Sequence, residues 1–175
     1  MQTYKIDGRA SEIHSAVEEM YIEKVLKRLS ILKKNTDFDI FFTQNFTVNS
    51  KLCRSLNEVE KLLPLMVRRL LIDDAEKFFS IIHGDLCFPN ILIEETHGFI
   101  RVIDPRGKFG SFDIYGDSRY DLAKLLHTLE GHYDCIIEDM FNVDVNGAQI
   151  NYKILMDYSR VVKIFFEIFN DVFEN

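Results

Sequence analysis

The chain has 175 residues, which is long enough for one domain with its own hydrophobic core and too short for two of ordinary size. Hydrophobic residues make up 47% and charged residues 28%, a balance that excludes a disordered chain and favours a globular protein. The formal net charge is −7, and because an acidic surface repels phosphate backbones we expect no nucleic acid partner.

The sequence contains no signal for membrane insertion or export. No apolar run approaches the length of a membrane span, and the first thirteen residues lack an apolar signal core. The three cysteines, Cys53, Cys87 and Cys135, form no CxxC pair, which excludes a zinc knuckle or a disulfide framework. We therefore expect a cytoplasmic protein with reduced thiols and no membrane partner.

The first half of the chain has helical periodicity. Apolar residues at helical spacing predict a helix from Ser11, as its N-cap, to about Lys34. The aromatic stretch that follows, residues 37–50, has no clear pattern. A second helix is predicted from the capping box that Ser55 opens, through about Leu71, with Pro64 expected to kink or divide it.

The second half begins with a short apolar run, Phe78 to Ile82. Two β-prone runs, Ile91–Ile93 and Phe99–Ile103, are separated by a polar turn and predict a hairpin. A helix capped by Asp117 or Ser118 should end at Gly131, and a last helix should run from about Asn151 to the end. The predicted fold class is mainly α with a small β-hairpin (α+β), as a single domain over residues 1–175.

Polar residues suited to phosphate chemistry gather in two segments of this plan. Asp85 and Asn90 lie five positions apart on one short loop, HGDLCFPN, and Asp104 follows the predicted hairpin. Phosphoryl transfer needs a carboxylate that orients the attacking hydroxyl and oxygen ligands for Mg²⁺. One Asp for the hydroxyl, with an Asp and an Asn for the metal, meets that need. Pro89 and Pro105 should hold the residues before them, Phe88 and Asp104, in extended conformations.

Three motifs in this order, HGDLCFPNILI, FIRVIDPRG and DSRYDLAKLLHTL, resemble the catalytic C-terminal lobe of the aminoglycoside phosphotransferase and choline kinase-like family, which has the protein-kinase-like fold. The resemblance covers about residues 79–130. It implies that Asp85 is the catalytic base and that Asn90 and Asp104 bind Mg²⁺ and, with it, ATP or another nucleoside triphosphate. It also implies that His83 braces the loop and that Asp121 accepts hydrogen bonds from the loop backbone.

The small lobe that covers ATP in such enzymes has no counterpart in the sequence before His83. That region contains no glycine-rich loop and no Walker A sequence, and it looks helical. We expect either that the chain is a truncated lobe or that another polypeptide supplies the N-terminal lobe as a partner.

The function expected from these features is a Mg²⁺-dependent phosphotransferase lobe, a small-molecule kinase. It would transfer the γ-phosphoryl group of a nucleotide to a hydroxyl of a small metabolite, sugar or aminoglycoside-like acceptor; the sequence DPRG after Ile103 resembles a subset associated with sugar, polysaccharide and metabolite kinases. One alternative is a non-catalytic, truncated kinase-like lobe that acts as a binding or regulatory module. Another is a metal-dependent hydrolase, which the lack of a His-rich cluster disfavours.

Several charged residues near the motifs allow two interpretations. Arg106 could contact phosphate or form an ion pair with an acidic neighbour, and Arg119 should brace Asp121 or another nearby acid. A group of acids could attract a cationic substrate, although a solvated acidic face is the preferred interpretation. These acids are Asp113, Asp117, Asp134, Glu138 and Asp139.

Overall fold

The structure is a computed structural model that describes residues 9–173, with side chains through residue 170. Its helical segments are α1 (Ala10–Glu18), η1 (Glu19–Glu23), α2 (Lys24–Leu32), η2 (Thr36–Phe38), α3 (Asp39–Thr43), α4 (Leu56–Val67), η3 (Arg68–Ile72), α5 (Ala75–Phe78), η4 (Phe88–Asn90), α6 (Ser118–Leu129), α7 (Tyr133–Ile137) and α8 (Ser159–Phe173). Its strands are β1 (Phe46–Val48), β2 (Lys51–Cys53), β3 (Phe79–Ile81), β4 (Ile91–Glu94), β5 (Phe99–Val102), β6 (Tyr115–Asp117), β7 (Phe141–Asn146) and β8 (Gln149–Ile154). The fold is α+β.

The first predicted helix is confirmed as one continuous helical arm, α1–η1–α2, although Arg9 rather than Ser11 occupies the N-cap position. The second is confirmed with its cap, since the Ser55 side chain accepts a hydrogen bond from Glu58 N at 3.3 Å. Division at Pro64 is wrong, because α4 continues through Pro64 and passes into η3. Packing of α4 against η1 and α2 stabilises this helix despite the backbone hydrogen bond that proline removes.

The strand content exceeds the prediction of a single hairpin. The predicted hairpin is present as β4–β5, with Gly98 at a φ of 71° in its turn. A second hairpin, β7–β8, occupies the region where we expected the last helix to begin, and that helix starts at Ser159 instead. Its signals were local: apolar residues alternate in β7 and β8, and Gly147, with positive φ, begins the two-residue turn Gly147-Ala148.

The region before His83 is also not wholly helical, because β1 and β2 form a short hairpin there. They belong to a four-stranded sheet of order β2-β1-β8-β7, in which β1 and β8 run parallel. The turn between them, Asn49-Ser50, has positive φ at both residues, as tight hairpins require. The prediction missed this sheet because its central pairing joins residues about 100 positions apart.

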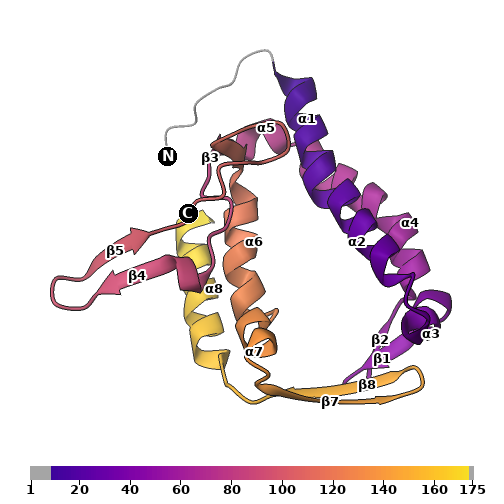
Figure 1. The fold of residues 1–175 in the computed structure, drawn as a ribbon. Coiled ribbons are helices and arrows are strands. Elements are labelled where there is room, and N and C mark those ends of the chain that lie inside the picture. Colours follow the sequence, from indigo (N-terminus) through magenta and orange to yellow (C-terminus); the bar gives the residue numbers. More distant parts are fainter. Residues whose placement is uncertain (1–8, 174–175) are drawn as a thin grey trace.

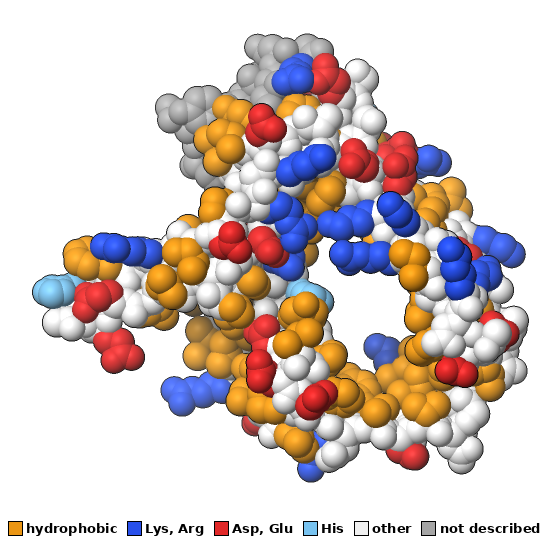
Figure 2. Space-filling model, in the orientation of Figure 1, with side chains coloured by type: hydrophobic (Ala, Val, Ile, Leu, Met, Phe, Trp, Pro, Cys, Tyr) orange, Lys and Arg blue, Asp and Glu red, His pale blue; other side chains and the backbone are white. Residues whose placement is uncertain are grey.

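Together the elements form a ring around a central opening (Figure 1 and Figure 2). The helical arm and α4 form one side, the four-stranded sheet closes the lower edge, and α6 with α8 forms the other side. The hydrophobic core lies at the top, where α1 and α5 pack against the β3–β6 pair; its centre is built from Val17, Phe79, Phe109 and Phe112. Within residues 9–173, no helix is both long and apolar enough to cross a membrane.

Candidate functional site

The loop of residues 82–90 begins where β3 ends, beside the start of α6. β3 pairs antiparallel with β6, and Ile82 N donates to Ile114 O at 3.0 Å. At the last position of β6, the buried side chain of Asp117 caps α6 by accepting from Arg119 N at 3.0 Å. This two-stranded sheet therefore sets the loop and the first turn of α6 next to each other.

Asp121, on the first turn of α6, binds the loop backbone with both carboxylate oxygens. Its Oδ2 accepts from His83 N at 2.7 Å, and its Oδ1 accepts from Gly84 N at 2.8 Å. Gly84 has a φ of 77°, which a side chain disfavours, and an added Cβ would lie 3.1 Å from Cβ of Arg106. Asp121 thus accepts hydrogen bonds from the loop backbone, the role expected for it.

His83 connects the loop to the end of the β4–β5 hairpin. Its Nδ1 accepts from Asp85 N at 3.3 Å, so the ring proton is on Nε2, which donates to Ile103 O at 2.8 Å. The His83 carbonyl accepts from Arg106 N at 2.9 Å. Both ring nitrogens are thus engaged with the backbone, as a bracing residue requires.

Asn90 lies at the other end of the loop, in the short helix η4. Its Nδ2 donates to Asp85 O at 2.9 Å, which leaves the side-chain Oδ1 as the acceptor that remains. Its carbonyl accepts from Ile103 N at 3.0 Å, so the loop and the hairpin are also joined here. Phe88 opens η4 and is not extended as Pro89 led us to expect.

Asp104 follows Ile103, the residue that is bonded to both Asn90 and His83. Its φ is 58°, so the expectation that Pro105 would keep it extended is wrong. Aspartate tolerates the left-handed region better than most residues, and such backbone conformations are frequent at functional sites. The segment carrying Asp104 is therefore tied directly to the loop that carries Asp85 and Asn90.

Asn90 and Asp104, the residues expected to bind Mg²⁺, lie on segments that are joined by the hydrogen bond from Ile103 N to Asn90 O. In the part of the chain that the structure describes, no group of three or more His, Cys, Asp or Glu side chains is placed to hold a metal ion. Mg²⁺ needs no such group, since it usually takes one or two protein carboxylates and completes its shell with phosphate and water. The amide oxygen of Asn90 and the carboxylate of Asp104 fit that donor set.

The Asp85 carboxylate is flanked by two cations. Its Oδ1 lies 2.8 Å from Nζ of Lys124 and 3.4 Å from Nη2 of Arg106. Burial by itself raises the pKa of Asp85, but the charges and hydrogen bonds of Lys124 and Arg106 outweigh burial and lower it below its ordinary value. Asp85 is therefore ionised at neutral pH.

Lys124 is the site residue that sequence reasoning missed. It lies three residues after Asp121 on α6, and this spacing places both side chains on the same face of a helix. That spacing was the available signal. Arg106 forms an ion pair with Asp85, which is the second of the two roles that the sequence allowed for it.

Arg119 braces a nearby acid, Asp117, and not Asp121. It makes a bidentate contact with the Asp117 carboxylate, with bonds of 2.7 and 2.8 Å, and donates to Leu71 O at 2.9 Å. Asp117 is fully buried, so it cannot belong to a solvated acidic face. Asp134 lies on α7 and Glu138 and Asp139 directly follow it, beyond the far end of α6 from Asp85.

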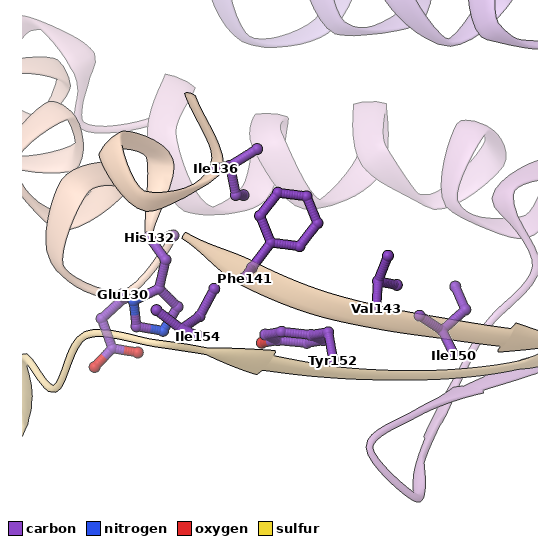
Figure 3. A pocket seen from close by; sticks show the side chains of 9 residues that line it. Glu130, His132, Ile136, Phe141, Val143, Ile150, Tyr152 and Ile154 are labelled. Carbon is purple, nitrogen blue, oxygen red and sulfur yellow. The ribbon is translucent and has the colours of Figure 1, made fainter. Parts of the chain in front are cut away.

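An apolar pocket of about 330 Å³ lies at that far end, between α7 and the β7–β8 hairpin. Figure 3 shows Phe141 pointing toward Ile136, with Tyr152 and Ile154 on the neighbouring strand. None of the residues predicted for phosphate chemistry lines it. The pocket is thus separate from the candidate site.

The chain matches no protein-family model, no curated protein and no solved structure. The interpretation of the site therefore depends on its own geometry and on the motifs.

Proposed function

We propose that this chain is the catalytic lobe of a Mg²⁺-dependent phosphotransferase with a protein-kinase-like fold, which transfers the γ-phosphoryl group of ATP or a related nucleotide to a hydroxyl of a small molecule. The observation that carries the proposal is the pair of hydrogen bonds from His83 N and Gly84 N to Asp121. They hold a loop on which an ionised Asp85 and an oriented Asn90 amide lie side by side. An ordinary turn would need neither the hydrogen bonds to Asp121 nor the oriented Asn90 amide beside Asp85.

In this proposal the acceptor hydroxyl binds to the Asp85 carboxylate, which directs its oxygen lone pair toward the γ-phosphorus. The new O–P bond forms as the bond to the β-phosphate oxygen breaks, and the hydroxyl proton passes to Asp85. A lowered pKa suits this role, because the loose transition state of phosphoryl transfer demands orientation more than strong basicity. Bound Mg²⁺, held by Asn90 and Asp104, would neutralise charge on the phosphates.

A transfer assay with labelled ATP and a panel of sugars and metabolites tests the proposal. We expect Mg²⁺-dependent transfer that Asp85→Asn and Asp104→Ala each reduce by about 100-fold or more. Asp113→Asn, a change at an exposed acid, is the matched control and should leave transfer unchanged. No transfer with any acceptor, or equal loss in the control, would contradict the proposal, and phosphate release without an acceptor would indicate the hydrolase instead.

Nucleotide affinity should be weak for this chain alone. Gly8 is the only glycine before Gly84, so no glycine-rich backbone precedes the loop to enclose the phosphates. Lys51 is a lysine on a strand before the loop, β2, but it is exposed and belongs to the four-stranded sheet at the lower edge of the ring. We expect calorimetric dissociation constants of about 0.1 mM or weaker, and tighter binding when an N-terminal lobe is supplied.

One observation favours the binding module as a second candidate. The Asp85 carboxylate is already paired with Lys124 and Arg106, an arrangement that could hold a ligand without any chemistry. Ligand binding by both wild type and Asp85→Asn, with no transfer in either, would select this function.

A further inference from the structure

Three cations surround Asp85 and Tyr120, and we call Lys24, Arg106 and Lys124 the basic cluster. Arg106 Nη1 donates to the Tyr120 hydroxyl at 3.2 Å, and Lys24 Nζ reaches the same hydroxyl at 3.5 Å. Arg106 and Lys124 meet at Asp85. The cluster is therefore one connected group built from α2, α6 and the segment after the β4–β5 hairpin.

Charge in the basic cluster is not balanced. Among the side chains that the structure describes, Asp85 is the carboxylate paired with the cluster, and Tyr120 contributes its hydroxyl, so three cations contact one carboxylate. Glu19 and Glu23 line a neighbouring hollow together with Lys24 and Lys27. Figure 2 shows Lys and Arg side chains gathered along the edge of the central opening, on a molecule whose formal net charge is −7.

Positive charge also acts on His127, three residues beyond Lys124 on α6. The pKa of His127 is lowered by burial first and then by the charge of Lys124, while Asp134 opposes this and Arg28 on α2 adds to it. A cation on α2 thus acts on a residue of α6. An anion placed between these two helices would meet positive charge from both.

One member of the cluster, Lys24, lies on α2 and not on the segments that carry Asn90 and Asp104. Asn90 and Asp104, the residues suited to metal and nucleotide phosphates, adjoin the β4–β5 hairpin. Figure 1 places this hairpin and α2 on opposite sides of α6. A ligand on the α2 side would therefore approach Asp85 from the face opposite the nucleotide.

We propose that the acceptor of this phosphotransferase site carries an anionic group, a carboxylate or a phosphate, which the basic cluster binds. The inference rests on the proposed function and names its substrate class. Lys124 and Arg106 already hold one carboxylate oxygen, that of Asp85, so their geometry suits an acceptor's oxyanion. Such an oxyanion competes for the same cations and frees Asp85 to receive the hydroxyl. A cationic, aminoglycoside-like acceptor is repelled.

The test uses the full chain without metal or nucleotide, so its outcome does not depend on phosphoryl transfer. The probes are inorganic phosphate and three sugars that differ in charge: glucuronate, glucose and glucosamine. Binding is followed by NMR shifts at probe concentrations of about 10 mM. We expect phosphate and glucuronate to bind at least about tenfold more tightly than glucose, and glucosamine to bind least.

Lys124→Gln and Lys24→Gln should each reduce the preference for the anionic probes by about fivefold or more, and circular dichroism verifies that each variant is folded. Lys34→Gln, at an exposed lysine just beyond α2, is the matched control and should keep the wild-type preference.

Absence of phosphate and glucuronate binding, or equal binding of glucosamine, would overturn the inference. It would also fail if Lys124→Gln weakened Mg²⁺-ATP binding and left the anionic probes unaffected, because the cations would then serve the nucleotide. If anions bind but no transfer is found, the proposed function fails and the anion site remains.

Discussion

A single carboxylate, that of Asp121, connects the first turn of α6 to the loop that carries Asp85. Because each oxygen accepts from a different backbone N–H, the side chain constrains two consecutive residues at once. Lys124, one helical turn further on, then reaches the next residue of the loop. One helix face thus holds both the loop backbone and its central acid.

Asp121→Ala should destabilise the fold. It leaves His83 N and Gly84 N without their acceptor, and each lost partner costs about 1–3 kcal/mol. Asp121→Asn keeps one acceptor oxygen, so its loss should be about half as large. Urea unfolding measures both variants, and an unchanged midpoint for Asp121→Ala would refute the bracing role.

Lys124→Gln should raise the pKa of His127, because burial and the charge of Lys124 are the two leading causes of its lowering. A lowered histidine pKa favours the neutral form in the native state, so folding stability falls as pH drops below the ordinary value of about 6.5. The variant should weaken this pH dependence. NMR titration of the His127 ring gives the pKa, with Lys34→Gln as control, and an unshifted value would show that Lys124 does not act there.

At the scale of elements, the β3–β6 pair and the cap of α6 position the candidate site. Asp117 has three functions in this unit: it ends β6, caps α6 and binds Arg119, which in turn reaches Leu71 O in η3. The guanidinium of Arg119 also lies 4.4 Å above the ring of Phe78. The ion pair of the partly buried Arg119 with the buried Asp117 therefore links η3, α5, β6 and α6.

Asp117→Ala should cost about 3–5 kcal/mol of unfolding free energy, because it leaves the partly buried Arg119 without its carboxylate and removes the helix cap. Arg119→Met should cost a similar amount by leaving Asp117 buried and unpaired. The double variant should cost less than the sum of the two. Denaturant titrations of the full cycle measure this coupling, and simple additivity would mean that the pair does not act as a unit.

At the scale of the whole molecule, the ring is closed by a few backbone contacts between distant segments. β1 and β8 pair over two residue positions, and Tyr152 N donates to Asn49 Oδ1 at 2.8 Å. The hydrophobic core around Phe79 lies at the opposite side of the ring. We therefore expect the β1–β8 contacts that close the ring to be less stable than the hydrophobic core. The candidate site lies on the side of the core.

Thr47→Pro should open the closure without unfolding the core. It removes the Thr47 N–H that donates to Ala148 O at 2.9 Å. We expect faster hydrogen exchange in β1 and β8 and unchanged protection in β3 and α6, since local opening follows contiguous units. Leu52→Ser, at an exposed position of the adjoining strand, is the control. Loss of protection throughout the chain would show that the ring unfolds as one unit.

Features that depend on near neighbours could be predicted from the amino-acid sequence. These are the helical arm, the Ser55 and Asp117 caps, the β4–β5 hairpin and the loop that carries Asp85 and Asn90. The Gly147-Ala148 turn of β7–β8 was equally local and was overlooked. Three other features were visible only in the folded chain: the β1–β8 pairing, the positive φ of Asp104 and the contacts of Lys24, Arg106 and Lys124 with Asp85 and Tyr120. Each of these features depends on residues that folding brings together from distant positions in the sequence. Helix caps, hydrophobic periodicity and turn residues are local signals, so they contain no information about such contacts.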